Sequence, residues 1–429
     1  MKQAKRAEWA KLDNASKIFP ATCNNKDTKV FRIACELHEP VDAAFLQEAL
    51  NTTIEHFPLF KAVLRKGVFW YYFQQSDIPP LVDSESTPVC APIYINGRRN
   101  LLFRVSYFHN RINLEVFHAL SDGTGAAWFL KTLIHHYLCL RHKETFVSNP
   151  VNLNYRASVS EQMADSFRRY FVGNELDIMR FINKDSHAKR QPRVFHLRGS
   201  KLEENRMKVI EGTMSTQAVL NIAHQYDTTL SVFFTALFLY SIYQIMPVRE
   251  QQRRIVLSVP INLRKYFVSV TARNFFSTMN IAYDFRGSKI ELIDVIKSVK
   301  AQFQRELTEE KLHAHLNQLM SIEKNILARI VPLPIKNYAL RVASSIRDKG
   351  ITGSISHVGE ITLPSEFKPF IRQFSICSSS KGPHITTCSY NDRYLLTFSS
   401  PFQETELQRT FFNLLAERGV DIEITSNLT

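Results

Sequence analysis

The feature that most constrains the fold is a junction between a strand hairpin and a helix, with one histidine at the junction. The runs 101–108 and 112–117 are rich in apolar residues and enclose the turn-type residues His109-Asn-Arg111, a pattern typical of two paired strands. His118 follows the second run, and the chain reads as a helix after Asp122 and Gly123. A strand followed by a helix after a short connection predicts a mixed α/β protein.

His118 is a candidate general base, because the end of a strand lies at the rim of a core. A neutral imidazole titrates near about pH 6.5 and can take a proton from a hydroxyl, thiol or amine. Asp122 lies at the wrong distance along the chain to be a simple triad partner, so we expect its carboxylate to pin the loop by pairing with an arginine. Gly123 and Gly125 permit the turn and a close approach of backbone.

The residues His118-x-x-x-Asp122-Gly123 resemble the HxxxDG motif of the chloramphenicol-acetyltransferase-like superfamily, which includes acyl-CoA-dependent alcohol acetyltransferases, plant acyltransferases and condensation domains of peptide synthetases. Four further segments extend the resemblance over nearly the whole chain, closest to the bacterial alcohol-acetyltransferase-like branch. They are the pattern Val259-Pro-Ile-Asn-Leu-Arg264, the pattern Ala272-Arg-Asn-Phe-Phe-Ser-Thr278, the opening Trp9 to Pro20 and the closing Phe411 to Asn427.

Two departures from the superfamily pattern bear on which branch the chain resembles. Many relatives carry paired histidines, and Phe117 stands here in place of the first, while His118 keeps the position that the family uses as base. This weakens the resemblance to the condensation domains of peptide synthetases a little. The C-terminal DFGWG motif of the plant branch is not visible, which argues against that branch.

The resemblance implies two chloramphenicol-acetyltransferase-like halves that form a pseudodimer with an active-site tunnel between them. We expect an N-terminal half at 1–183 and a C-terminal half at 206–429. The intervening 184–205 is the best linker candidate, since its first ten residues are basic, polar and broken by a proline. A chain that already contains both halves has less need of a partner, so a monomer is expected.

The resemblance also assigns roles to residues of the second half. Arg264 would be the partner of Asp122, with Arg104 as a local alternative, and the pair would lock the loop that carries His118 and Gly123. Asn274, Ser277 and Thr278 lie on the segment that in relatives crosses the channel. One of them would donate a hydrogen bond to the developing oxyanion, or the segment is an ordinary strand with polar residues facing outward.

Strand and helix patterns recur in both halves. The first half reads as a strand at 30–37, a helix at 42–56 and strands at 62–65 and 68–73. The second half reads as a strand at 207–214, a helix capped by Ser215 and an apolar helix from Leu230 with Thr228 or Thr229 as its cap; strands at 255–259 and 278–283 and a charged helix at 290–307 follow.

The net charge indicates an anionic partner but does not say which kind. Lys and Arg number 54 against 40 Asp and Glu, and this net charge of +14 suits a CoA phosphate, an acidic carrier protein, a membrane surface or a nucleic acid. We expect no nucleic-acid partner, because no RNP signature, zinc finger or helix-turn-helix motif stands out.

Membrane spans and metals are also not expected. The longest apolar run, 230–242, is too short to cross a bilayer and the chain starts with charged residues, so we expect a soluble cytoplasmic protein. The six cysteines form no CxxC pair, and the histidine pairs 135–136 and 313/315 lack the spacing and third ligand of a metal site. The prediction is a protein with no disulfide, no metal and no permanently bound cofactor.

The function that these residues predict is an acyltransferase with acyl-CoA as co-substrate. His118 would remove the proton from an alcohol or amine acceptor as it attacks the thioester, without a covalent acyl-enzyme. Two alternatives stay open. A stand-alone condensation-type enzyme would take its acyl group from a carrier protein, and a non-catalytic descendant would only bind a ligand or partner.

Overall fold

The strand hairpin and helix around His118 form as the sequence predicts. This computed structural model describes residues 9–147, 157–172, 193–286, 290–325 and 329–428. The hairpin consists of β6 (Phe103–Phe108) and β7 (Arg111–Phe117), which pair antiparallel across a turn where His109 takes a left-handed conformation with φ of 51°. Helix α3 (Gly123–Arg141) follows after five residues.

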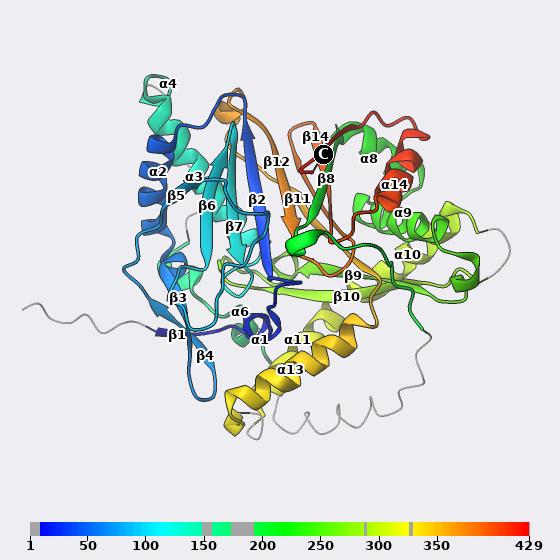
Figure 1. Cartoon of the computed structure of the whole chain (residues 1–429), viewed down its shortest axis with the longest axis horizontal. Helices are drawn as coiled ribbons and strands as arrows, with labels where there is room; N and C mark the ends of the chain where they lie inside the picture. The colour runs from blue at the N-terminus through cyan, green and yellow to red at the C-terminus, as the bar shows by residue number, and fades with distance from the viewer. Residues whose placement is uncertain (1–8, 148–156, 173–192, 287–289, 326–328, 429) are drawn as a thin grey trace, which may run out of the picture.

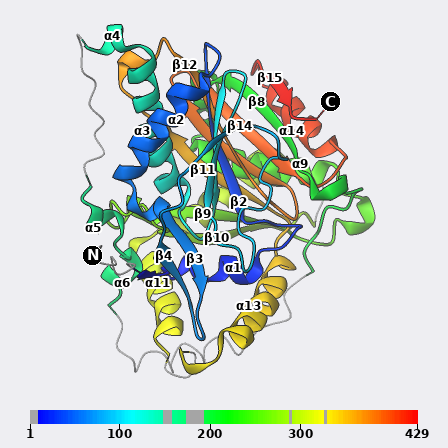
Figure 2. The same ribbon diagram turned by 60° about the vertical axis from the view of Figure 1, so that its left-hand side comes forward.

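The hairpin belongs to a five-stranded sheet in the first half. Its strands are β12 (Ile371–Ser378), β2 (Val30–Leu37), β7, β6 and β5 (Val82–Ser84), in that order. Helices α2 (Ala43–His56) and α3 pack against each other and lie together over one face of this sheet (Figure 2).

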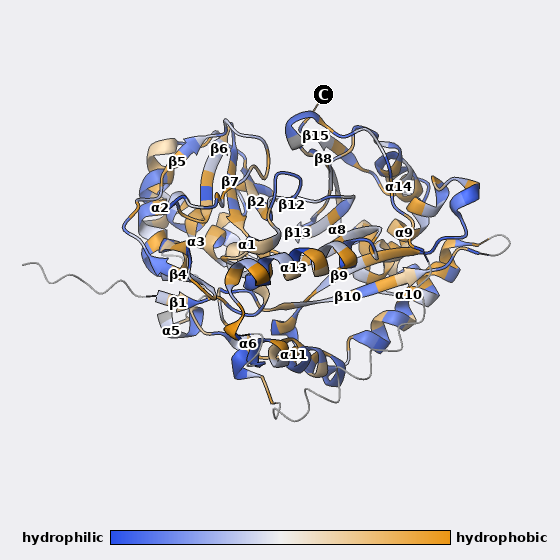
Figure 3. Cartoon of the chain, turned by 60° about the horizontal axis from the view of Figure 1, so that its bottom comes forward, coloured by the Kyte–Doolittle hydropathy of each residue, from blue (hydrophilic) through white to orange (hydrophobic). Residues whose placement is uncertain are grey.

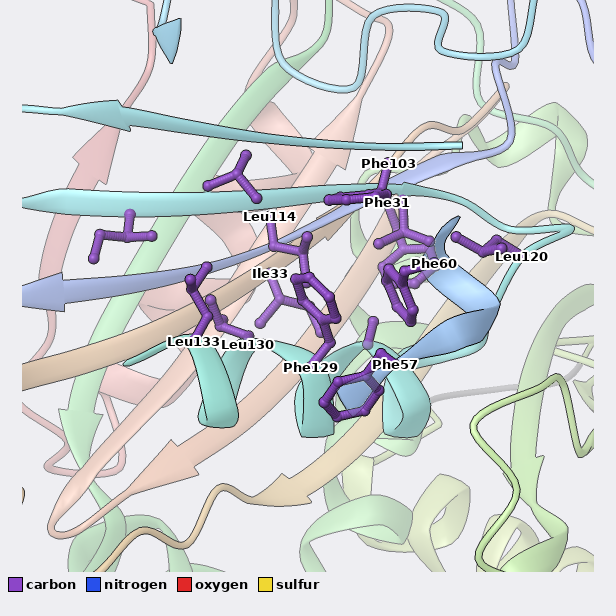
Figure 4. Close-up of a cluster of buried hydrophobic side chains, with 14 of the residues drawn as sticks. Phe31, Ile33, Phe57, Phe60, Phe103, Leu114, Leu120, Phe129, Leu130 and Leu133 are labelled. Atoms are coloured by element: carbon purple, nitrogen blue, oxygen red, sulfur yellow. The ribbon is translucent and has the colours of Figure 1, made fainter. Parts of the chain in front are cut away.

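A core rich in aromatic residues fills the space between this sheet and its helices (Figure 4). The ring of Phe129 from α3 stacks on Phe60, with 4.2 Å between ring centroids, and meets Phe57 and Phe103 edge to face. Each such pair adds about 0.5–1.5 kcal/mol beyond burial of its area. The core therefore holds α3 firmly against the strands that lead to His118.

The second half is built on a seven-stranded sheet. Its order is β10 (Phe276–Tyr283), β9 (Ile255–Asn262), β11 (Gly353–Glu360), β13 (His384–Tyr390), β14 (Arg393–Ser400), β8 (Lys208–Ser215) and β15 (Glu423–Ser426). The helices that pack around its core include α8 (Thr216–Gln225), α9 (Leu230–Gln244), α10 (Leu292–Glu306) and α14 (Glu406–Ala416) (Figure 1).

The predicted helix caps of this half are confirmed. Ser215 Oγ accepts from the Ala218 N–H at 3.2 Å, and Thr229 Oγ1 accepts from the Val232 N–H at 3.4 Å. Helix α9 has buried residues on all sides, because α8, α10, α14 and the sheet enclose it.

The two halves interlock rather than meet at a simple boundary. Strand β12 comes from the range 206–429, yet it pairs antiparallel with β2 in the sheet of the first half. The first nine residues of the expected linker, 184–192, lie outside the described residues. Its remainder packs on the second half, where buried Phe195 donates its N–H to the Arg254 carbonyl at 3.0 Å.

A small three-stranded sheet and several helices lie against both halves. The sheet has the order β1 (Trp9–Lys11), β4 (Tyr71–Gln75) and β3 (Ala62–Lys66). The remaining described helices are α1 (Ile18–Thr22), α4 (Lys143–Val147), α5 (Val159–Gln162), α6 (Ser166–Arg169), α11 (Glu309–Lys324) and α13 (Leu333–Asp348). Among the described helices, none has both the length and the apolar character needed to cross a bilayer.

Candidate active site

Three aromatic rings and a backbone hydrogen bond hold His118 at the end of β7. Its N–H donates to the Lys29 carbonyl at 2.8 Å. The imidazole stacks on Phe19 with 4.5 Å between ring centroids, meets the edge of Phe31 at 5.0 Å and lies 5.4 Å from Phe276. These contacts come from both halves of the chain and leave the half-buried ring little rotational freedom.

Asn274 fixes which nitrogen of His118 carries the proton. Its Nδ2 donates to the His118 carbonyl and to Ser16 Oγ, both at 2.9 Å. A carbonyl can only accept, so the amide orientation is determined and Oδ1 is the atom that lies 3.1 Å from His118 Nδ1. Nδ1 must therefore donate to Oδ1, and in the neutral ring the lone pair is on Nε2.

Burial keeps this imidazole neutral near pH 7. It lowers the pKa of His118 below its ordinary value of 6.5, and the nearby Asp122 carboxylate and the Asn274 hydrogen bond oppose that shift only in part. A neutral ring with a free Nε2 lone pair is the state that a general base requires.

Asp122, four residues after His118, binds groups of both halves. Its Oδ1 caps α3 by accepting from the N–H groups of Thr124 and Gly125 at 3.1 and 3.0 Å. Its Oδ2 accepts from Arg264 Nη1 at 2.7 Å and from the Phe275 N–H at 2.9 Å. A helix start in the first half is thus tied to a loop of the second.

The ion pair expected between Asp122 and Arg264 is present, and both side chains are buried. Arg264 also donates to the carbonyls of Thr271 and Arg273 at 2.8 and 2.6 Å, so it shapes the loop that delivers Asn274. Arg104, the local alternative, pairs with Glu115 instead.

The close approach of backbone falls on Gly125 and not on Gly123. A Cβ at Gly125 would lie 2.2 Å from the Ala272 carbonyl oxygen, whereas one at Gly123 would meet no atom within 4 Å. The role expected for Gly123 has no steric basis here, because the loop of the second half presses on the helix two residues later.

The three candidate oxyanion residues occupy different positions. Asn274 is buried and contacts His118. Ser277 lies on the side of β10 that faces the second core, where its Oγ has no hydrogen-bond partner within the described chain. Thr278 is exposed and shares its side of the strand with Phe276, the ring that approaches His118. Strand alternation therefore leaves Thr278 as the hydroxyl on the imidazole side.

Phe117 is a core residue. Its side chain is fully buried and stacks on Tyr94, with 5.1 Å between ring centroids. Because successive side chains of a strand point to opposite sides, the residue at 117 packs inward while the chain turns His118 toward the second half. The phenylalanine in place of a first histidine therefore leaves the surroundings of the His118 ring intact.

The sequence pattern missed the groups that support Asn274. Ser16 Oγ, which accepts from Asn274, donates to Asp13 Oδ2 at 2.6 Å, and Arg273 lies 3.5 Å from the same carboxylate. Burial raises the pKa of Asp13, while Arg273 lowers it. Asp13 and Ser16 lie in the opening segment that carries the resemblance, which was the one signal available for them.

A second imidazole, His384, was also missed. It begins β13 and its Nδ1 lies 2.6 Å from Ser354 Oγ. Burial lowers the pKa of His384 to about 4, and the nearby His118 ring adds to this shift while Asp27 opposes it. His384 is therefore neutral at pH 7 and lies within electrostatic range of His118.

A pocket of about 800 Å³ lies beside the segment that supports Asn274. Leu12 and Lys17 line it from that segment, and Trp9, Phe69 and Trp70 add aromatic walls. Its charged lining consists of one carboxylate and five cations: Glu323 against Lys11, Lys17, Arg168, Lys324 and Arg329.

No protein-family model matches the chain, and no curated protein matches it significantly in sequence. Solved structures do match. The first condensation domain of the CDA synthetase is 14% identical, with 96% of each chain covered and a TM-score of 0.65. The trichothecene 15-O-acetyltransferase of Fusarium sporotrichioides is 9% identical, with 95% of this chain and 93% of that chain covered and a TM-score of 0.64.

A starter condensation domain of rhizomide synthetase, solved as a mutant in complex with C8-CoA, is 13% identical. The match covers 95% of this chain and 94% of that one, with a TM-score of 0.62. The chain therefore has the fold that these condensation domains share with the trichothecene acetyltransferase.

Proposed function

We propose that the protein is an acyltransferase that moves an acyl group from acyl-CoA to an alcohol or amine, with His118 as general base. The observation that carries the proposal is the bond between His118 Nδ1 and Asn274 Oδ1, which leaves the lone pair on Nε2. The fold supports it, since proteins of this fold include an O-acetyltransferase and a domain solved with C8-CoA.

The proposed reaction is a direct displacement. Nε2 of His118 takes the proton from the acceptor hydroxyl or amine while the acceptor atom bonds to the thioester carbonyl carbon, which gives a tetrahedral oxyanion. The oxyanion collapses, the carbon–sulfur bond breaks, and the imidazolium returns the proton to the leaving thiolate. The products are an ester or amide and free CoA, and the base contributes on the order of 10²–10⁴ in rate.

Thr278 is the proposed donor to the oxyanion. Its hydroxyl is on the same side of β10 as Phe276, whose ring approaches His118. Ser277 faces the core, and Asn274 is already hydrogen-bonded to His118 and Ser16. A hydrogen bond made to the charge that develops in the transition state raises kcat, because it is weaker in the ground state.

The pocket beside Leu12 and Lys17 supports CoA as the donor. Five cations against one carboxylate suit its phosphates, and the exposed aromatic walls suit its adenine. Lys17 lies two residues before Phe19, which stacks on His118, so the proposed nucleotide site is close to the reacting centre along the chain.

A carrier-protein thioester is the second candidate donor, because condensation domains are prominent among the matching structures. The net charge of +14 would equally suit an acidic carrier protein. In both cases the chemistry at His118 is the same and only the bearer of the thioester differs.

The test is acceptor-dependent release of thiol from a panel of acyl-CoAs, acetyl to long-chain, with mixed alcohols and amines. Release that requires both partners, with the acylated acceptor found by mass spectrometry, supports the proposal and names the acyl class. Release only from acyl groups loaded on a carrier protein favours the second donor. A folded protein that releases no thiol from either donor contradicts acyl transfer and favours a binding protein.

A further inference from the structure

Helix α13 turns an apolar side to solvent. Ile335, Tyr338, Val342 and Ile346 follow one another at intervals of three or four residues and so share one side of the helix. Their side chains are 42 to 71% exposed. The opposite side, which packs on the protein, carries the buried polar residues Asn337 and Ser344 beside Leu333.

The exposed apolar side continues onto the loop between β3 and β4. Leu333 donates its N–H to the Val68 carbonyl at 2.9 Å, and Lys336 Nζ donates to the Phe69 carbonyl at 3.1 Å. Val68 and Phe69 are themselves exposed. We call these six side chains the apolar patch: Val68, Phe69, Ile335, Tyr338, Val342 and Ile346. Figure 3 views the molecule from a direction that shows α13 in front.

Basic residues accompany the apolar patch. Helix α13 and the residue after it carry Lys336, Arg341, Arg347 and Lys349 against one carboxylate, Asp348. Lys336 lies over the Trp70 ring, 3.5 Å from its centroid, at the junction of the helix and the loop. Large aliphatic and aromatic side chains flanked by lysine and arginine are typical of helices that lie in the interface of an anionic bilayer.

We propose that the apolar patch docks the protein on an anionic lipid surface. Contiguous exposed apolar residues mark an interaction site on a water-soluble surface. A second copy is a poorer occupant, because a two-fold interface would bring the same basic residues of both copies together. The proposal does not depend on acyl transfer. Val68 and Phe69 also line the 800 Å³ pocket, so a docked lipid surface would lie at its rim.

The experiment measures co-sedimentation of the full-length protein with vesicles made of equal parts phosphatidylcholine and phosphatidylglycerol. The test variant, I335E/I346E, places two carboxylates in the apolar patch. The control, V248E/I424E, also replaces two exposed aliphatic residues by glutamate, but outside the apolar patch. We expect the wild type and the control to bind, and the test variant to bind at least about tenfold more weakly at an unchanged melting temperature.

A measurement on the wild type keeps the proposal testable if the variant does not fold. Binding should be lost with pure phosphatidylcholine vesicles and should weaken as sodium chloride is raised from about 50 to about 500 mM, because the charges are screened. No binding to anionic vesicles, or equal binding of both variants, would overturn the proposal. So would a wild-type dimer in sedimentation velocity that I335E/I346E alone dissociates, since the occupant would then be a second copy.

Discussion

At the scale of single residues, the proposed chemistry at His118 depends on one amide, Asn274, which fixes the tautomer of the ring. Asn274 touches His118 at two points: it donates to the backbone carbonyl and accepts from the ring. The amide therefore fixes both the position of the loop and the tautomer of the ring. It is a positioning residue, since the structure gives its polar atoms partners within the protein.

Replacing Asn274 by alanine should lower kcat by on the order of 10-fold to 100-fold and leave KM little changed. The ring keeps its place between Phe19 and Phe31 but loses the acceptor that selects its tautomer, so the lone pair is no longer held on Nε2. Steady-state kinetics of thiol release measure the split. A rise in KM at constant kcat would mean that Asn274 contacts substrate instead.

The pH dependence of kcat/KM follows from the burial of His118. Its pKa is lowered below 6.5, and the base works only when neutral, so activity should be lost as the pH falls through that lowered pKa and should be level above it. Thiol release between about pH 4 and pH 8 tests this. An acid limb centred above pH 6.5 would contradict a buried neutral base.

Sequence reasoning singled out the proposed general base and part of its support. His118 lies at the predicted end of a strand, Asp122 lies just before the predicted helix, and the two belong to one motif. Asn274 was singled out with a different role, because a strand pattern does not say which atom a side chain meets. Ser16 was given no role, since its bond to Asn274 joins residues 258 positions apart and no local pattern encodes such a contact.

At the scale of elements, the start of α3 is where hydrogen bonds and an ion pair join the first half to the second. Asp122 caps this helix with one carboxylate oxygen and uses the other for Arg264 and the Phe275 N–H. All four donors bind one buried carboxylate. Loss of this carboxylate leaves the buried guanidinium of Arg264 without the negative charge of Asp122.

Asp122→Ala should therefore lower the free energy of unfolding by about 3–5 kcal/mol. The matched control is Asp42→Ala, which removes an N-cap of α2 that accepts from two exposed N–H groups and has no buried arginine. That cap should cost about 0.5–2 kcal/mol. Urea unfolding compares the two, and equal losses would show that Asp122 acts as a cap alone.

Elements with local signals were predicted well. The strand at 30–37 and the caps at Ser215 and Thr229 agree with the structure, because side-chain periodicity and capping are properties of neighbouring residues. The exchange of β12 into the first sheet was not foreseen, since strand pairing across the chain has no sequence-local signature.

At the scale of the whole molecule, the exchange of β12 makes each half incomplete without the other. Without the second half, which supplies β12, the β2 edge is unpaired, and Asp122 and His118 lose Arg264 and Asn274. An open edge with a buried face is unstable and aggregates. We therefore predict that the segment 184–205 does not separate two units that fold independently.

A fragment of residues 1–205 should not unfold cooperatively in urea, as followed by near-ultraviolet circular dichroism. Co-expression with 206–429 as a separate chain should restore a cooperative transition, because it supplies β12, Arg264 and Asn274 together. A cooperative transition in the isolated fragment would show that the first half folds by itself.

The most direct test of His118 as general base is the rate of acceptor-dependent thiol release by His118→Ala, compared with the wild type and with His38→Ala, an exposed histidine elsewhere in the chain. We predict that the rate falls by a factor on the order of 10²–10⁴ for His118→Ala alone, with the melting temperature of all three proteins unchanged. A folded His118→Ala protein whose rate stays within about tenfold of an active wild type would contradict it.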